Sequence, residues 1–273
     1  MPELPEVETV RAYLARTLKG RRIEAVEVRL PRLLKNRTAT AFIGALTGRR
    51  IRSVTRKGKY LGVQLDDASM LLIHLRMTGT LRYLSDERPV PPSSHLIFTL
   101  DKGCLVYGDV RTFGCFWLVP QQGETGVEGY DSLGPDGNGE AFTADYLWQL
   151  LHASTRRIKA LLLDQSAVAG LGNIYADEAL FLAGIRPARR CSRISRAASD
   201  RLHAAIRKVL AEGIAHGGTT IRDFVDGSGN EGKNRENLAV YGREGQPCKR
   251  CGTLITYVKQ GGRGTHYCRR CQR

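Results

Sequence analysis

The sequence predicts an α+β protein of two domains, an antiparallel β-sandwich followed by a helical domain with a cysteine-rich end. Three observations predict this class. Residues 1–120 consist mainly of short β-branched and aromatic segments with turn residues between them, which is typical of an antiparallel sandwich. From residue 141 onward the apolar residues follow helical spacing. Four of the seven cysteines lie within the last 26 residues.

The N-terminal domain is expected to occupy residues 1–125. It begins with a helix in "LPEVETVRAYLARTL". Strands are expected in "RRIEAVEVRL", "GRRIRSVTRKGKYLGVQL", "SMLLIHLRM", "SHLIFTLDKGCLVYGD" and "FGCFWLVP", where turn residues separate segments of partial period-two alternation. The stretch 120–140 is rich in Gly, Pro and Asp, which predicts an interdomain linker at 126–140.

The helical domain is expected at residues 141–237. Thr143 is a suitable N-cap for its first helix, and Gly184 is a suitable end for the helix in "NIYADEALFLA". Ser195 or Ser199 begins a long amphipathic helix that ends at Gly217-Gly218. Residues 219–237 show little periodicity, and a loop of that length inside a compact domain is usually functional or disordered.

The remaining segment, 238–273, contains two C-x2-C pairs separated by sixteen residues. Two such pairs on facing knuckles place four thiolates around one Zn²⁺, the spacing of a structural ribbon site. The alternative is two disulfides, which the lack of a secretory signal disfavours. The expected ligands are Cys248, Cys251, Cys268 and Cys271, while the scattered Cys104, Cys115 and Cys191 are expected to be ordinary thiols.

The charge balance indicates a polyanionic partner. The chain has 42 Lys and Arg against 27 Asp and Glu, a formal charge of +15, and residues 231–273 carry ten basic and three acidic side chains. Such an excess attracts phosphate backbones or anionic membranes. No apolar run approaches the ~18 residues of a membrane span, and Met1-Pro2-Glu3 does not begin a signal peptide. We expect a cytoplasmic, monomeric protein that binds nucleic acid.

The amino terminus carries unusual chemistry. Removal of Met1 leaves Pro2 with a free secondary amine, and an α-amino group has a pKa of about 7.7–8. A neutral amine attacks electrophilic carbon and forms an iminium, as in Schiff-base enzymes. Glu3 and Glu6 follow at the helix start, where carboxylates are favoured. The same residues also suit an inert helix start, because Pro and acidic side chains are common there.

Three segments resemble bacterial formamidopyrimidine-DNA glycosylases: "PELPEVET" at 2–9, "GLGNIYADEALF" at 170–181, and the C-terminal "VYGREGQPCKRCG…GRGTHYCRRCQR". They occur in the order and spacing of that family. The resemblance implies a β-sandwich joined to a helix-two-turn-helix domain and a zinc finger. It implies excision of 8-oxoguanine and formamidopyrimidines from damaged duplex DNA, then strand cleavage by β,δ-elimination.

The resemblance also implies roles for individual residues. Pro2 corresponds to the nucleophile that attacks the sugar C1′, and Glu3 to the general acid/base. Lys59, rather than the neighbouring Lys57, corresponds to the lysine that approaches the lesion-flanking phosphate and assists elimination. Arg263 corresponds to the finger arginine, for which phosphate binding is expected because a guanidinium is a poor acid at neutral pH.

Further residues correspond to DNA contacts of the family. Enzymes that act on a base in duplex DNA flip it out and fill the gap, a task that a flexible apolar side chain, a guanidinium and an aromatic wedge perform together. The segment 219–237 corresponds to the loop that closes over the everted base. The expected void-filling residues are Met77, Arg111 and Phe113, and the other expected contacts are Glu6, His95, Lys159 and Asn173.

Some positions depart from the family pattern. This chain has Ser93-Ser94-His95 where the family often has His-x-His, so it lacks the first histidine and with it the phosphate contact that this histidine makes in the family. Ser154 and Thr155 stand at expected lysine positions, where the adjacent Arg156 and Arg157 can substitute. Asn234 stands in the capping loop where relatives have an aromatic residue or methionine.

Two other functions remain open. One is an endonuclease VIII-like glycosylase for oxidised pyrimidines, which also begins with Pro-Glu but lacks the "PELPEVET" form and the void-filling trio. The other is a non-catalytic zinc-ribbon DNA-binding protein, which needs the basic tail but not Pro2, Glu3 or Lys59.

Overall fold

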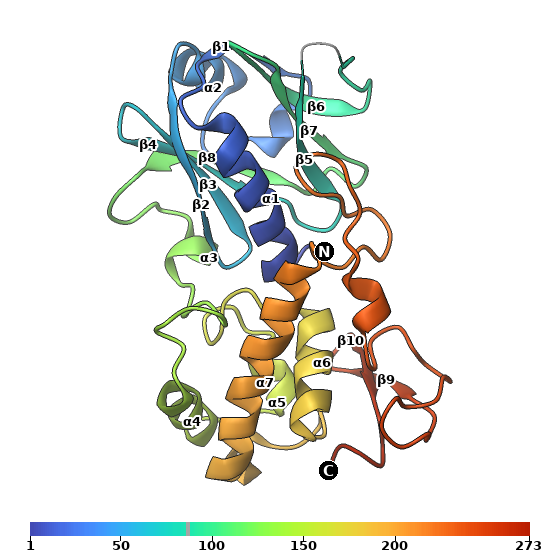
Figure 1. Cartoon of the computed structure of the whole chain (residues 1–273). Coiled ribbons are helices and arrows are strands. Elements are labelled where there is room, and N and C mark those ends of the chain that lie inside the picture. The colour runs from blue at the N-terminus through green and yellow to red at the C-terminus, as the bar shows by residue number, and fades with distance from the viewer. Residues whose placement is uncertain (86–87) are drawn as a thin grey trace. The chain divides into compact units, whose positions relative to one another are not determined.

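The structure of the protein is a computed structural model that describes residues 1–85 and 88–273 (Figure 1). The described chain divides into two compact units. The first contains Met1–Asp131 and His216–Lys233, and the second contains Ser132–Ala215 and Asn234–Arg273. The boundary at residue 131 falls inside the segment expected as a linker.

The first unit is an antiparallel sandwich, as the sequence predicted. Within residues 1–85 and 88–233 its two four-stranded sheets have the orders β1-β6-β7-β5 and β2-β3-β4-β8. The strands are β1 (Ile23–Val28), β2 (Ile51–Lys57), β3 (Tyr60–Leu65), β4 (Ser69–His74), β5 (Gly79–Leu84), β6 (Ser94–Leu100), β7 (Cys104–Asp109) and β8 (Cys115–Pro120).

Helix α1 (Leu4–Leu18) packs onto this sandwich, and Figure 1 shows it alongside both sheets. Its buried face recurs at Val7, Val10, Leu14 and Leu18, the three- and four-residue spacing of an amphipathic helix. These side chains share one core cluster with residues of both sheets. The sequence reading missed β5 and the short helix α2 (Ala39–Leu46), and the remaining elements of the unit are the 3-10 turn η1 (Pro31–Leu33) and α3 (Glu128–Asp131).

The segment 216–233 packs with the sandwich, although the sequence had grouped it with the helical domain. Phe224 is buried in the sandwich core, 9% exposed. The backbone N–H of Tyr83 in β5 donates to the carbonyl of Gly227 at 2.9 Å. A Cβ at Gly227 would lie 2.5 Å from the Tyr13 ring, so only glycine allows this close approach to α1.

The second unit contains the helices and the cysteine-rich hairpin. Thr143 caps α4, its hydroxyl accepting from Tyr146 N–H at 3.0 Å, and Gly184 ends α6 with φ 73°. Both confirm the sequence prediction, as does Ser195, which directly precedes α7. The elements are α4 (Ala144–His152), α5 (Ile158–Leu162), α6 (Asn173–Ala183), η2 (Cys191–Arg193), α7 (Arg196–Ala215), η3 (Asn234–Asn237), β9 (Thr256–Gln260) and β10 (Arg263–Tyr267).

Among residues 1–85 and 88–273, no helix combines sufficient length with sufficient apolar character to span a membrane.

Candidate active site

The N-terminal residues are held in a fixed position at the start of α1. Pro2 is buried and Glu3 is 3% exposed, whereas Met1 is 51% exposed. The Glu3 backbone N–H donates to the Glu6 carboxylate at 2.8 Å, one half of a capping box. The helix start therefore fixes the backbone that carries the candidate nucleophile and the candidate acid/base.

The second oxygen of Glu6 binds the segment 216–233. Glu6 Oε1 accepts from the Thr219 N–H at 2.7 Å, although the two residues are 213 positions apart. Gly218, with φ 84°, makes this approach possible, since a Cβ there would lie 3.0 Å from the Glu6 Cγ. The structure thus assigns Glu6, which is 1% exposed, a link between the N-terminus and the expected capping loop.

The capping loop itself is closed by its own hydrogen bonds. The Thr220 hydroxyl accepts from Gly232 N–H and donates to the Phe224 carbonyl, both at 2.8 Å. Thr219 forms a β-bridge with Lys233 at the base of the loop. Of the expected loop 219–237, residues 219–233 therefore belong to the first unit, while residues 234–237 belong to the second.

Lys59 is the second residue of the two-residue β2–β3 turn and is 4% exposed. The turn is braced against α1: Arg56 Nε lies 3.0 Å from Glu8 Oε2, and Arg56 Nη1 donates to the Gly58 carbonyl at 3.0 Å. Glu8, the last acidic residue of "PELPEVET", therefore positions the turn that carries Lys59. Lys57 is placed differently, with its Nζ 5.0 Å from the Tyr130 ring centroid.

His74 is a neighbour of Lys59 that sequence reasoning missed. It pairs with Tyr60 across β3 and β4, and its Nδ1 accepts from the Arg76 N–H at 3.0 Å. Burial, together with the charges of Arg76 and Lys59, lowers the pKa of His74 from 6.5 to about 3. The imidazole is neutral at physiological pH, and its position in "HLRMTG" was the available sequence signal.

The three expected void-filling residues come together at the ends of two turns. Met77 is 44% and Phe113 is 52% exposed, and Arg111 is exposed as well. The Arg111 guanidinium carbon lies 4.8 Å from the Phe113 ring centroid, and Arg111 Nη1 lies 3.0 Å from Met77 Sδ. Large apolar side chains exposed together in this way are typical of a binding surface.

His95 lies on β6, and its Nε2 is 2.9 Å from the carbonyl oxygen of Asp109. The ring is therefore oriented by the last residue of β7, directly before the turn that carries Arg111 and Phe113. Ser94 beside it is buried, whereas Ser93 is exposed.

In the second unit, α6 binds the β9–β10 hairpin. Asn173 Nδ2 donates to the carbonyl of Gly264 at 2.9 Å. Asp177 accepts from the His266 N–H at 2.9 Å, and Glu178 accepts from the backbone N–H groups of residues 239, 240 and 241. Burial raises the pKa of Glu178, while these three donors lower it. Sequence reasoning had not assigned these two acidic residues a role, although "GLGNIYADEALF" contains both.

Lys159 lies in a different environment from the one expected of a DNA contact. It is 2% exposed, and its Nζ is 2.7 Å from Asp177 Oδ1. It also donates to the Gly264 carbonyl at 2.8 Å and to Thr265 Oγ1 at 2.9 Å. An ammonium has three donors, so these partners leave none for a phosphate. In this conformation Lys159 positions the hairpin rather than binding DNA directly.

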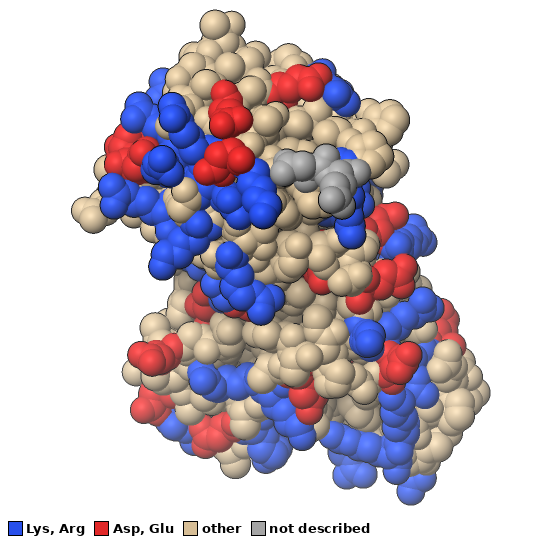
Figure 2. Space-filling view, turned by 45° about the horizontal axis from the view of Figure 1, so that its top comes forward, with Lys and Arg blue, Asp and Glu red and all other residues tan. Residues whose placement is uncertain are grey.

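Arg263 begins β10 and is exposed. It lines a cavity of about 330 Å³ within the second unit, together with Gln260 of the same hairpin and with Arg156 and Arg157, which precede α5. Arg156 also pairs with Asp164 at 2.7 Å. The cavity thus has a basic lining suited to phosphate, and Figure 2 shows many other Lys and Arg side chains on the viewed face of the molecule.

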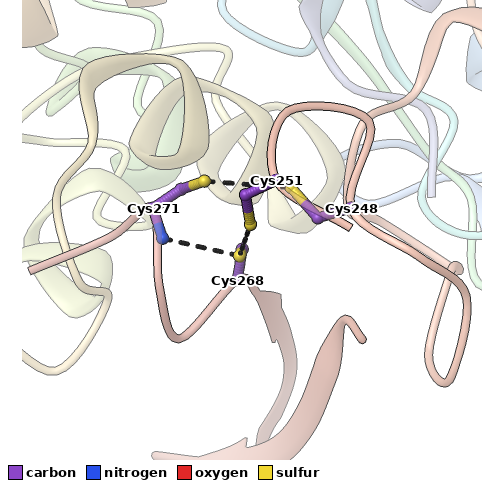
Figure 3. Close-up of side chains that lie close together, drawn as sticks. All are labelled: Cys248, Cys251, Cys268 and Cys271. Carbon is purple, nitrogen blue, oxygen red and sulfur yellow. Dashed lines mark hydrogen bonds between the residues drawn. The ribbon is translucent and has the colours of Figure 1, made fainter. Parts of the chain in front are cut away.

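The four C-terminal cysteines form one cluster (Figure 3). Their sulfur atoms all lie within 4.8 Å of one another, with Cys251 and Cys268 at 3.5 Å and Cys248 and Cys271 at 3.9 Å. Tetrahedral Zn–S bonds of about 2.3 Å separate sulfurs by roughly 3.8 Å, whereas a disulfide requires about 2.05 Å. The residues therefore fit one structural zinc ion, held beside the β9–β10 hairpin.

Comparisons with known proteins agree with this architecture. Three family models match the chain: the formamidopyrimidine-DNA glycosylase N-terminal domain over residues 1–116, its H2TH domain over 133–225, and the zinc finger found in FPG and IleRS over 245–273. The second match places a helix-two-turn-helix domain in the helical half of the chain, as the sequence resemblance had implied.

Individual relatives cover essentially the whole chain. A formamidopyrimidine-DNA glycosylase of Pelotomaculum thermopropionicum is 46% identical over 100% of this chain and 99% of its own length. A point mutant of the Lactococcus lactis FPG, solved with Fapy-dG-containing DNA, has a TM-score of 0.91 at 38% identity and 99% coverage of both chains. The wild-type L. lactis protein, solved with DNA containing an oxidized pyrimidine, has a TM-score of 0.90 at the same identity and coverage. The chain belongs to the formamidopyrimidine-DNA glycosylase family.

Proposed function

We propose that this protein is a bifunctional DNA glycosylase and AP lyase of base excision repair that excises oxidised purines from duplex DNA. The observation that carries the proposal is the N-terminal Pro2-Glu3 pair, buried at the capped start of α1 in a chain that matches the family along its whole length. Relatives were solved with DNA containing Fapy-dG and carbocyclic 8-oxo-G. The protein acts as a monomer on damaged duplex DNA in the bacterial cytoplasm.

The reaction begins at Pro2 after Met1 has been removed. The neutral secondary amine donates its electron pair to the sugar C1′, and the bond from C1′ to the damaged base breaks. Glu3 protonates the ring oxygen as the sugar opens, which leaves an iminium between Pro2 and C1′. The departing base takes the electron pair of the broken bond, and the proton that the Pro2 nitrogen loses on forming the iminium balances the proton that the base receives.

The iminium then acts as the electron sink for strand cleavage. Loss of a C2′ proton sends electrons toward the iminium and expels the 3′ phosphate, and a second elimination expels the 5′ phosphate. Addition of water to the iminium then releases the sugar fragment as an aldehyde and returns Pro2 to its free amine. Lys59 assists elimination at the phosphate that flanks the lesion, because an ammonium stabilises the charge of the leaving group.

The remaining residues grip the DNA and hold it open. Met77, Arg111 and Phe113 enter the space that the everted base leaves, with Arg111 directed at the orphaned cytosine. Arg263, Asn173 and His95 bind the phosphate backbone. Glu6 connects the N-terminus to the start of the loop 219–237, which closes over the everted base.

Borohydride trapping tests the proposal. The mature protein, incubated with an 8-oxoguanine duplex and borohydride, is expected to form a covalent protein–DNA adduct through Pro2. Peptide mass spectrometry locates the adduct, and Pro2→Gly is the matched variant. Trapping at full efficiency through another residue in Pro2→Gly contradicts the assignment of the nucleophile, and an absence of any adduct in the wild type contradicts the function.

A second substrate belongs in the same assay. The wild-type L. lactis relative was solved with DNA containing an oxidized pyrimidine, which favours a broader substrate range as the second candidate function. Excision of 8-oxoguanine should exceed excision of thymine glycol. The reverse order would assign the protein to oxidised pyrimidines, as in endonuclease VIII-like enzymes.

A further inference from the structure

The void-filling residues stand on two turns that are strained at one position each. The β4–β5 turn carries Met77, and the β7–β8 turn carries Arg111 and Phe113. Arg76 and Thr112, at these turns, have φ values of 58° and 54°. Non-glycine residues are uncommon in this left-handed region and persist where surrounding contacts hold them.

The carboxylate of Asp109 joins the two turns. Its Oδ1 accepts from the Thr78 hydroxyl and from the Arg111 N–H at 3.1 Å. Its Oδ2 accepts from the Gly114 N–H and from the Tyr107 hydroxyl, both at 2.9 Å. The side chain is 3% exposed. One buried carboxylate therefore joins the turn before β5 to both ends of the turn before β8.

The surroundings leave this carboxylate little freedom. A Cβ at Gly114 would lie 1.7 Å from the Tyr107 hydroxyl, and one at Gly79 would lie 2.5 Å from it. Glycine at both positions thus lets the Tyr107 hydroxyl reach Asp109. The carbonyl of Asp109 also lies 2.9 Å from His95 Nε2, so the backbone on which the carboxylate stands is held as well.

The exposed ends of the two turns depend on this arrangement. Arg111 contacts both Met77 and Phe113, at 3.0 Å to the sulfur and 4.8 Å to the ring centroid. The Arg111 N–H, which fixes where that side chain begins, is bound by Asp109 and by Thr78 Oγ1 at 3.2 Å. Displacing the carboxylate would separate the three side chains from one another.

We propose that Asp109 is the positioning residue of the wedge formed by Met77, Arg111 and Phe113, and that it sets the rate at which the wedge enters duplex DNA. The inference rests on the proposed function, since it assumes that these three side chains fill the gap left by an everted base. Asp109 itself is buried below the turns and contacts the wedge through Thr78, Gly114 and the Arg111 backbone.

The test uses Asp109→Asn in the full-length, zinc-loaded protein. The substituted amide has one oxygen in place of two, so it can accept from only one of the Gly114 and Arg111 N–H groups, and one of these two hydrogen bonds is lost at nearly constant volume. Loss of a charge-assisted hydrogen bond corresponds to about a ten- to hundredfold lower rate. We expect a decrease of that size in 8-oxoguanine excision from duplex DNA, with cleavage of a preformed abasic site in single-stranded DNA changed by less than about twofold.

A fluorescent duplex reports the wedge directly. It contains tetrahydrofuran opposite cytosine, with 2-aminopurine next to that cytosine. Wild-type binding should change the fluorescence, and Asp109→Asn should reduce that change at least about threefold, as expected when a rigidly held group becomes mobile. Thr78→Val should act in the same direction, and Thr78→Ser, which keeps the hydroxyl, should restore the signal.

Asp67→Asn is the matched control. Asp67 also accepts from a backbone N–H and a hydroxyl at a sandwich turn, both of Ser69, but the β3–β4 turn carries no wedge residue. If Asp109→Asn does not fold, the fluorescence and excision measurements on Thr78→Val test the inference in its place. The inference is overturned if the Asp109 and Thr78 variants show the same fluorescence change and the same excision rate as the wild type. It is also overturned if their activities on duplex and on single-stranded DNA decrease by the same factor. Failure of the wild type to form a borohydride adduct would instead overturn the proposed function.

Discussion

Replacing Lys159 by methionine removes a buried cation at nearly constant side-chain length, so it isolates the contribution of the charge. The pair with Asp177 is 2.7 Å long, and the two side chains are 2% and 0% exposed. Removing one partner of a buried ion pair typically costs about 3–5 kcal/mol, because the other charge is left uncompensated. Lys159→Met should therefore lower the free energy of unfolding by about that amount.

The loss of stability should appear in the second unit, which contains the Lys159–Asp177 ion pair. Lys159 also binds the Gly264 carbonyl and Thr265 Oγ1 at 2.8 and 2.9 Å, so the β9–β10 hairpin should detach at lower temperature. Calorimetry of the zinc-loaded protein should show a Tm lower by on the order of 10 °C. Zinc release, followed with a chromogenic chelator, should accelerate in parallel.

A double-mutant cycle separates the ion pair from a general packing defect. Asp177→Asn keeps an acceptor for the His266 N–H, and the combination of Lys159→Met with Asp177→Asn leaves neither charge behind. The double variant should lose at least about 2 kcal/mol less than the sum of the single variants. Lys208→Met is the control, because Lys208 is exposed and lies 3.8 Å from Glu212; its effect should stay within about 0.5 kcal/mol.

Two results would refute this reasoning. One is a loss below about 1 kcal/mol in Lys159→Met, and the other is strict additivity in the cycle. The salt dependence of DNA binding gives an independent check. If Lys159 contacted a phosphate directly, Lys159→Met would reduce the slope of log affinity against log salt concentration by about one. If Lys159 is only the partner of Asp177, the substitution leaves this slope unchanged.

The remaining predictions concern zinc, pH and α6. Chelation of zinc should weaken DNA binding by at least about tenfold while the circular dichroism of the sandwich persists, because the cysteine cluster lies in the second unit; intact binding after chelation contradicts this. The folded pKa of His74, about 3, lies below its usual 6.5, so the unfolded chain binds an extra proton below pH 6.5 and stability falls from there toward pH 3. His74→Asn should flatten this dependence by about 2 kcal/mol between pH 6.5 and 5 in urea titrations. Glu178→Ala should release the backbone at residues 239–241, seen as faster amide exchange there, while unchanged exchange would show that other contacts hold the segment.

Local sequence features determined much of the architecture. Alternating apolar residues predicted most strands of the sandwich. Thr143 predicted the start of α4 and Gly184 the end of α6, because both act through hydrogen bonds and dihedral angles within one helical turn. The spacing of the four cysteines predicted the metal cluster for the same reason, since a two-residue spacer fixes each pair locally. The helix α2 and the strand β5 were missed. β5 acquires its conformation from pairing with β7, and eight residues of α2 carry too little periodic signal.

The sequence by itself therefore determined the fold class, the zinc site and the charge of the partner, while the residues of the proposed chemistry were predicted from its resemblance to a known family. Only the tertiary structure decided which of those side chains are buried and what they contact. Lys159 and Lys57 are the same residue type, yet one is buried in an ion pair and the other lies beside a tyrosine ring. Glu6 meets Thr219 across 213 positions of sequence. Such contacts depend on how distant segments pack, and no pattern within a short window of residues records that packing.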